Sequence, residues 1–182
     1  QAEPYLRESL EGRIRVLGPD HPETLKSLNN LGAVLFHQGK LDEAENCFRE
    51  ALEVRRRVLG ENHASTLSSV NNLAGVLLLQ GKLNEAENCY RHALEIGRRI
   101  NGKDHPHTFI FLDNLGRVLV RQDKLTEAEP YIVESVQGHQ RVFGGDHPST
   151  LKSMELLGEL FLERGQFPDA ENYFRMVLQG LR

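Results

Sequence analysis

The sequence predicts an all-α fold, an α-solenoid of antiparallel helix pairs with about nine helices. Two unrelated strings recur along the 182-residue chain at the same step of 42 residues. The first begins as LGPDHPETL at residues 17–25 and returns from residues 59, 101 and 143; the second, Ala-Glu, stands at residues 2, 44, 86, 128 and 170. One period shared by two strings across the whole chain predicts stacked copies of a single two-helix unit.

This period divides the chain into parts of a single repeat array covering residues 1–182. Repeat arrays normally end in polar capping elements, and neither end of this sequence looks like one, so we expect a fragment of a longer protein. The second helix of a truncated repeat is expected at 1–17, followed by repeats at 18–59, 60–101, 102–143 and 144–182. The expected helices cover residues 1–17, 22–38, 42–58, 64–80, 84–100, 106–122, 126–142, 148–164 and 168–181.

The first helix of a repeat is predicted by apolar residues at helical spacing. Pro22 suits the first turn, where its missing N–H is not needed, and Asp20 or His21 can cap the helix. Gly39 ends it. The stripe that would face the core in this helix consists of Leu25, Leu28, Leu31, Leu35 and Phe36.

The second helix has its own start and stop signals. Asp42 followed three residues later by Glu45 has the form of a capping box. Three arginines at 55–57 place cations near the negative end of the helix dipole, and Gly60 then breaks the helix. Its apolar stripe consists of Ala44, Phe48, Ala51 and Leu52.

Composition narrows the protein class. The formal net charge is −4, which disfavours a nucleic-acid binder that neutralises phosphates. The longest apolar runs are four residues, as at 109–112, too short for membrane insertion, which needs about 20. Two cysteines cannot build a disulfide framework. These features predict a cytoplasmic protein.

The motifs of the first repeat resemble a known family. LxxLGxxL at residues 28–35, then AxxxF at 44–48 and Ala51, is similar to the tetratricopeptide pattern with leucine in place of its leading tryptophan. The usual period is about 34 residues. The longer period and the strings LNNLG, GKLDEAE and LGxxHP resemble the kinesin light chain type, although MELL at 154–157 and FPD at 167–169 depart from it. The resemblance implies a right-handed superhelix with a concave groove lined by the first helices.

Signals of catalysis or metal binding are weak, and we predict no enzyme, cofactor or metal site. Cys47 and Cys89 stand where other repeats carry tyrosine, so we interpret them as packing residues with inert thiols. The recurring loop histidines are separated by two helix layers of roughly 8–10 Å each, whereas zinc ligands must converge within ~2 Å of one ion. We therefore interpret them as loop caps; they are His21, His63, His105 and His147.

At ~100° per residue, one set of first-helix positions lies opposite the core stripe. In tetratricopeptide arrays this side lines the groove, as the resemblance implies. The residues are Lys26, Asn29, Asn30, Ala33 and His37; Ser68, Asn71, Asn72, Gly75 and Leu79; Ile110, Asp113, Asn114, Arg117 and Arg121; and Lys152, Glu155, Leu156, Glu159 and Glu163.

Within this set a ladder of amides predicts peptide binding. An amide side chain offers both a donor and an acceptor, so it can pair with a peptide backbone. Similar asparagines in kinesin light chains contact cargo peptides, which supports the transfer to this chain. The alternative is that the amides bond neighbouring helices and only fix repeat stacking. The predicted peptide-binding residues on the first helices are Asn30, Asn72, Asn114, Asn29, Asn71, Lys26, Arg117 and Arg121.

Arg13 and Arg55 complete the predicted site from the second helices. Arg55 extends the apolar stripe with a charge, so it either emerges at the groove wall or pairs with a nearby carboxylate. The resemblance implies that arginines here hold acidic cargo motifs, whereas Glu155, Glu159 and Glu163 would make the fourth repeat acidic.

We therefore expect a non-catalytic adaptor that binds an extended peptide of a protein partner, with no nucleic acid and no membrane insertion. The alternative is a structural or regulatory sensor segment of a larger signalling or enzymatic protein. In that case the array self-associates, or its own chain occupies the groove.

Overall fold

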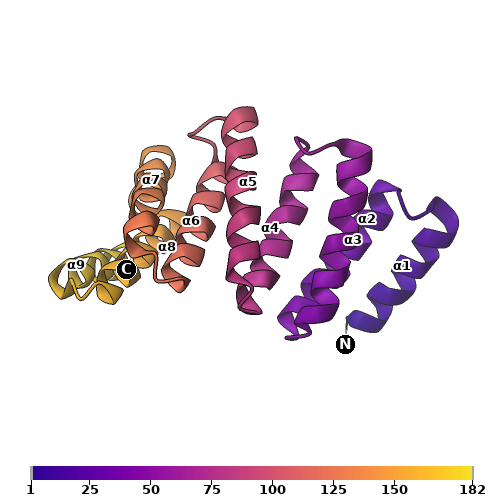
Figure 1. The fold of residues 1–182 in the computed structure, drawn as a ribbon, viewed down its shortest axis with the longest axis horizontal. Coiled ribbons are helices and arrows are strands. Elements are labelled where there is room, and N and C mark those ends of the chain that lie inside the picture. The colour runs from indigo at the N-terminus through magenta and orange to yellow at the C-terminus, as the bar shows by residue number, and fades with distance from the viewer. Residues whose placement is uncertain (1, 182) are drawn as a thin grey trace. The chain divides into compact units, whose positions relative to one another are not determined.

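A computed structural model describes residues 2–181 of the chain, which form nine α-helices and contain no strand (Figure 1). Short loops join the helices, as expected for antiparallel neighbours. The helices are α1 (Glu3–Leu17), α2 (Pro22–His37), α3 (Leu41–Leu59), α4 (Ala64–Leu79), α5 (Leu83–Asn101), α6 (Pro106–Arg121), α7 (Leu125–Phe143), α8 (Pro148–Glu163) and α9 (Phe167–Gly180).

The predicted all-α architecture is confirmed, and the helix boundaries differ from the prediction by one or two residues. The largest systematic difference is in the second helices, since α3, for example, begins at Leu41 and ends at Leu59. The expected start of the first helix at residue 1 lies outside the described residues. Gly18, Gly60, Gly102 and Gly144 separate helices as predicted, with φ between 84° and 91°, a conformation that residues with a Cβ rarely adopt.

The loop string builds the same cap in each repeat. Nδ1 of His21 accepts a hydrogen bond from the backbone N–H of Glu23 at 3.2 Å. Each of the other loop histidines accepts the same bond from the residue two positions after it. The capping interpretation is therefore confirmed. Thr24 adds a second bond, because its hydroxyl donates to the carbonyl of Gly18 at 2.8 Å. The equivalent threonines, Thr66, Thr108 and Thr150, repeat this bond.

The predicted cap of the second helix is wrong. Lys40, not Asp42, is the N-cap residue of α3, and no side chain caps this end. The reason is the tight turn before it. Gly39 has a φ of 75°, and the amide of Lys40 donates to Leu35 O at 3.0 Å. This turn returns the chain to helical geometry before Asp42 is reached.

The chain divides into two compact units, residues up to Cys89 and residues from Tyr90, with the boundary inside α5. In the first unit α2 packs against α1 and α3, and α3 packs against α4. Gly32 permits the close approach of α2 and α3, since a Cβ there would lie 2.8 Å from the ring of Phe48. The fully or almost fully buried apolar residues of this unit include Leu35, Ala44, Phe48, Ala51, Val70 and Leu77.

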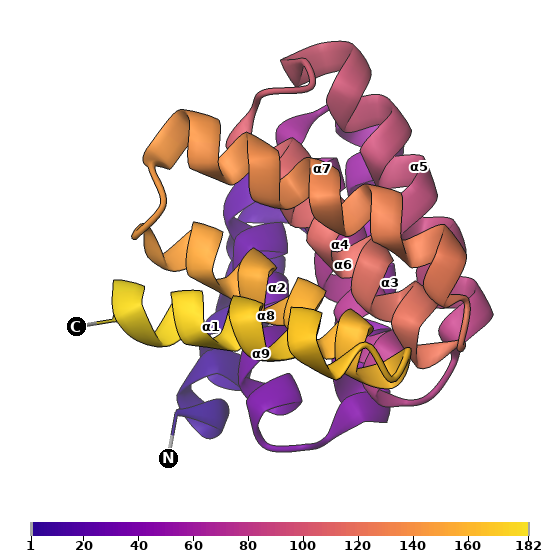
Figure 2. The same ribbon diagram turned by 90° about the vertical axis from the view of Figure 1, so that its left-hand side faces the viewer.

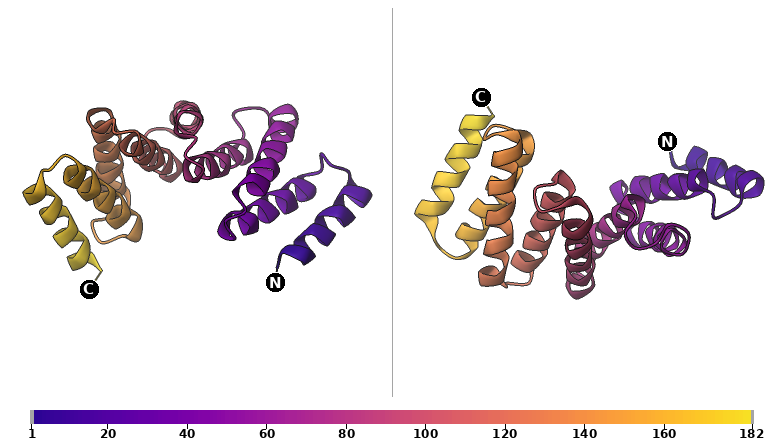
Figure 3. Two further views of the ribbon diagram at one scale, coloured as in Figure 1. Left: turned by 60° about the horizontal axis from the view of Figure 1, so that its bottom comes forward. Right: turned by 90° about the horizontal axis from the view of Figure 1, so that it is seen from above.

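In the second unit α6 packs against α7, α7 against α8, and α8 against α9. The last two helices, in orange and yellow, lie side by side (Figures 2 and 3). Gly158 lies beneath the ring of Phe174 as Gly32 lies beneath Phe48. The core includes Leu112, Leu115, Leu119, Ile132, Leu157 and Leu160. Within the described residues, no helix has the length and apolarity that crossing a bilayer requires.

Candidate peptide-binding surface

The predicted site residues of the first unit lie on α2 and α4. Lys26 and Asn30 are exposed on α2, whereas Asn29 on α2 and Asn71 and Asn72 on α4 are half-buried. Small residues accompany them, with Ala33 on α2 and Gly75 on α4. We call these first-helix positions the first-helix face of the first unit, and their counterparts on α6 and α8 the first-helix face of the second unit.

One amide of the predicted ladder bonds a neighbouring helix. Nδ2 of Asn72 donates to Oδ1 of Asn29 at 3.1 Å, which links α4 to α2. Asn72 can still offer its carbonyl oxygen and its second N–H to another group, because a primary amide has two donors. The bond thus provides the stacking contact of the alternative interpretation without using all of the amide's hydrogen-bonding capacity.

In the second unit the face is more charged. Arg117 and Arg121 are exposed on α6, and Asn114 is half-buried there. On α8, Leu156 was expected on the same face as the asparagines, but it is only 1% exposed and belongs to the core. On α8 this position therefore faces the neighbouring helices closely enough for an apolar side chain to be buried.

Arg55 on α3 lies against polar groups of the next first helix, α4. It is buried, and its Nη1 donates to Ser69 Oγ at 2.6 Å and to the backbone carbonyl of Ser65 at 3.1 Å, both on α4. No carboxylate within the described residues forms an ion pair with it. Burial lowers the pKa of Arg55 from its ordinary value, yet a guanidinium remains protonated. The chain thus holds a desolvated cation whose protein partners are neutral.

Arg13 occupies the equivalent position on α1. It donates to Ser27 Oγ and to the carbonyl of Glu23 at 3.2 Å, and its guanidinium lies 3.9 Å from the Glu23 carboxylate. Ser27 and Ser69 are themselves 42 residues apart, so the arginine–serine pair is a feature of the repeat. In the second unit the pair becomes His139 and Ser153, with Nδ1 and Oγ 2.9 Å apart.

The repeat geometry agrees with a family comparison. The family model described as "Tetratricopeptide repeat" matches residues 1–57, 23–99, 65–132 and 109–182. These overlapping matches cover the whole chain. The chain belongs to the tetratricopeptide repeat family.

Solved tetratricopeptide repeat (TPR) structures agree with this assignment. A point variant of a kinesin light chain-like protein from Podosopora anserina, with nearly identical TPR-like repeats, has a TM-score of 0.86 and 22% identity, over 98% of this chain and 84% of that chain. BtubC (BKLC) from P. vanneervenii has a TM-score of 0.85 and 22% identity, over 98% and 71%. The apo form of RapI has a TM-score of 0.82 and 16% identity, over 96% of this chain and 61% of that chain. The comparison with curated proteins yields no match.

These likenesses show the fold, an all-α repeat solenoid whose structural neighbours are kinesin light chain-like TPR proteins. The fold is typical of non-catalytic proteins, and the cysteines of this TPR chain give no sign of activation. Cys47 and Cys89 are half-buried and unpaired, and burial raises the pKa of both thiols. A thiol with a raised pKa is a poor nucleophile near neutral pH.

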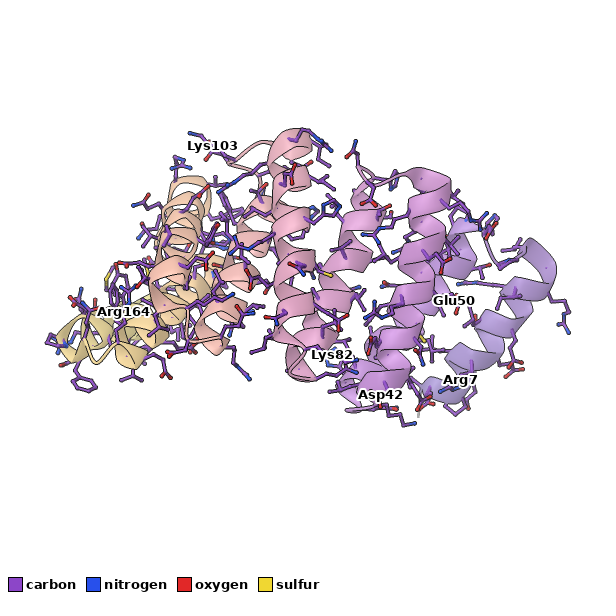
Figure 4. The ribbon with its side chains drawn as sticks, in the orientation of Figure 1. Arg7, Asp42, Glu50, Lys82, Lys103 and Arg164 are labelled. Carbon is purple, nitrogen blue, oxygen red and sulfur yellow. The ribbon has the colours of Figure 1, made fainter. Side chains whose placement is uncertain are left out.

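Sequence reasoning missed the ion pairs that join successive second helices of the TPR array. Arg7 on α1 lies beside the start of α3 (Figure 4) and pairs with Glu43 at 2.5 Å, and Arg49 pairs with Glu85 at 2.9 Å. Lys82, in the turn before α5, adds a related pair with Glu45 of α3 at 2.8 Å. The signal was available, because arginine and glutamate recur 36 residues apart. These pairs neutralise charge on the second helices, in contrast to the uncompensated Arg55.

Proposed function

We propose that the chain is a non-catalytic scaffold that binds an extended peptide of a protein partner along its first-helix face, as a cargo adaptor would. The observation that carries the proposal is the amide pair on α2 and α4. Asn29 and Asn72 place neighbouring amides on this face beside the small residues Ala33 and Gly75. Amide groups next to small side chains offer hydrogen bonds and space to a peptide backbone.

The buried cation adds a preference for ligand charge. Arg55 is desolvated and lacks a carboxylate partner, so an acidic side chain of the peptide would supply one. Charge-assisted hydrogen bonds to a guanidinium are stronger than neutral ones. Within the second unit, the exposed Arg117 and Arg121 favour acidic peptide residues at α6, whereas Glu155, Glu159 and Glu163 disfavour them at α8. We infer a cytoplasmic setting, which suits two unpaired cysteines.

The test begins with selection of peptides from a random displayed library on the purified chain. The affinities of the selected peptides are then measured by calorimetry for Asn72→Ala, Asn29→Ala and, as a control, Asn46→Ala, which alters an exposed asparagine of α3. We expect Asn72→Ala to weaken binding several-fold while its melting temperature stays within a few degrees of the wild type. Asn46→Ala should change neither quantity.

Two results would contradict the proposal. If Asn72→Ala and Asn29→Ala lower stability equally and leave affinity unchanged, the amide pair only fixes repeat stacking. If the library yields no binder, the structural or regulatory alternative is favoured, and the oligomeric state of the chain then distinguishes self-association from occupancy by a flanking segment.

A further inference from the structure

A polar cluster lies between α6, α7 and α8 in the second unit, and its least buried member is Asp113, whose side chain is 19% exposed. Oδ2 of Asp113 on α6 accepts a hydrogen bond from Ser153 Oγ on α8 at 2.7 Å. Nδ1 of His139 on α7 lies 2.9 Å from the same hydroxyl and 3.9 Å from Asp113 Oδ2. Ser135 on α7 lies within 3.4 Å of both Ser153 and His139. Ser135 and Ser153 are fully buried, and His139 is 3% exposed.

The other oxygen of Asp113 lacks a partner like the one that Asn29 has at the equivalent position of α2. Asn29, at the equivalent position on α2, accepts from Asn72, 43 residues later. Forty-three residues after Asp113 stands Leu156, which is buried and has no donor. Oδ1 of Asp113 is accordingly buried without a hydrogen-bond partner. An unsatisfied buried oxygen penalises the ionised carboxylate most strongly.

The cluster nevertheless has a hydrogen-bond arrangement for each protonation state of Asp113. When Asp113 is ionised, the Ser153 hydroxyl donates to Oδ2 and can accept from Nδ1–H of His139. When Oδ2 carries the proton, it can donate to Ser153 Oγ. The serine hydroxyl then turns to the backbone carbonyl of Ser149, which lies 3.2 Å away. Rotation of one hydroxyl therefore accommodates both states.

We propose that Asp113, Ser135, His139 and Ser153 form a proton-binding site that makes the packing and the surface charge of the second unit depend on pH. Because Asp113 belongs to the first-helix face of α6, the charge of this face changes when the site takes up a proton. The site does not depend on the proposed peptide binding, since its ligand is the proton itself.

The electrostatic surroundings support this assignment. Burial raises the pKa of Asp113 to about 6, even though hydrogen bonds from Ser135 and Ser153 and the charge of Arg117 on α6 act in the opposite direction. On α7, burial lowers the pKa of His139, and His147 at the start of α8 lowers it further. Asp113 Oδ2 and His139 Nδ1 lie 3.9 Å apart, so a charge on either group acts on the other at short range. Within the described residues, three charged or titratable groups act on Asp113 or on its neighbour in the cluster. They are Arg117 on α6, His139 on α7 and His147 at the start of α8.

The direct test is a pH titration of the intact 182-residue chain followed by NMR of the aspartate carboxyl carbons. We expect Asp113 to titrate near pH 6, above the ordinary value of an aspartate side chain. The matched variant is Asn29→Asp, which places a carboxylate at the equivalent position of α2, where Asn72 can donate to it. The carboxyl group introduced by Asn29→Asp should have a lower pKa than the carboxyl group of Asp113. Asp113 titrating at or below its ordinary value would overturn the proposal.

Thermal unfolding gives a second, independent readout. Asp113→Asn mimics the neutral side chain, so its melting temperature should exceed that of the wild type above about pH 7 and approach it near about pH 4. Glu155→Gln removes an exposed acid on α8 and should show no such convergence. A difference between Asp113→Asn and the wild type that stays constant from acid to neutral pH would also overturn the proposal.

Discussion

The ring of Phe111 lies 3.2 Å from the point that a Cβ on Gly97 would occupy. This contact replaces the polar pair seen in the other repeats, because Gly97 and Phe111 stand where Arg55 and Ser69 stand one repeat earlier. In both cases the residue on the second helix meets the residue 14 positions later on the next first helix. The four pairs are Arg13 with Ser27, Arg55 with Ser69, Gly97 with Phe111, and His139 with Ser153. The chain therefore varies one contact site: both partners change in the Gly97–Phe111 pair, whereas the His139–Ser153 pair keeps the serine.

Three helical glycines should respond differently to alanine. A Cβ at Gly12 would have no heavy atom outside its own helix backbone within 4 Å, so Gly12→Ala should stabilise by up to about 1 kcal/mol through helix propensity. At Gly138 a Cβ would overlap the ring of Phe109, and overpacking of this kind costs about 1–3 kcal/mol. The change in the free energy of unfolding caused by Gly97→Ala should lie between those of the other two variants. Urea unfolding measures all three; equal effects would contradict the packing argument.

The threonine of the loop string should be required for its hydroxyl. Thr66 is fully buried, and its hydroxyl donates to Gly60 O at 2.8 Å. Thr66→Val keeps the shape but removes this bond, so we expect a loss of about 1 kcal/mol, or roughly 2–4 °C in melting temperature for a chain of this length. Thr66→Ser should retain the bond. Thr126→Val, at an exposed position of α7, should have no effect.

Acid stability should depend on Glu45. Burial alone would raise the pKa of Glu45, but hydrogen bonds from Lys82, Arg49 and Gln80 outweigh it and hold the pKa at about 2. Because this value is below that of the unfolded chain, Glu45 stabilises the fold above about pH 4.5, and the contribution is lost as the pH falls toward 2. Allowing for solvent screening, we expect Glu45 to contribute roughly 1–2 kcal/mol to the free energy of unfolding at neutral pH.

The check is the pH dependence of unfolding. Glu45→Gln should be less stable than the wild type at neutral pH and should lose less stability on acidification. Glu50→Gln, at an exposed residue of α3, provides the control. A wild type and a Glu45→Gln variant that lose stability in parallel between about pH 5 and pH 2 would show that Glu45 makes no such contribution.

The repeat period was sufficient to predict the fold, because the helices recur at the same step, as do the loop glycines Gly18, Gly60, Gly102 and Gly144. The polar interior could not be predicted in this way. Burial of Leu25 and Phe48 is expected from their apolar side chains. Arg55, in contrast, is buried because Ser69 and a backbone carbonyl lie within hydrogen-bonding distance of its guanidinium. Similarly, Asp113 differs from Asn29 by one atom type, and its missing partner becomes visible only when α6 and α8 are placed together.

Arg55 should be the charge-sensing residue of the peptide-binding surface. Its guanidinium is buried and has neutral partners on α4, so an acidic peptide residue would form its first ion pair. Charge-assisted bonds to desolvated groups contribute about 1.5–3 kcal/mol. We therefore expect Arg55→Ala to weaken binding of a selected acidic peptide by roughly 10- to 100-fold. Arg55→Glu should weaken it more, because it adds repulsion.

Two comparisons separate this role from a structural one. Arg55→Met keeps much of the side-chain volume and removes the charge, so it should preserve the melting temperature better than it preserves affinity. Replacing the acids of the selected peptide by their amides should abolish the difference between wild type and Arg55→Met, and added salt should weaken the acidic peptide more than its amidated form. If the acidic and amidated peptides bind equally at every salt concentration, Arg55 does not contact the ligand, and the amide pair of α2 and α4 must carry recognition alone.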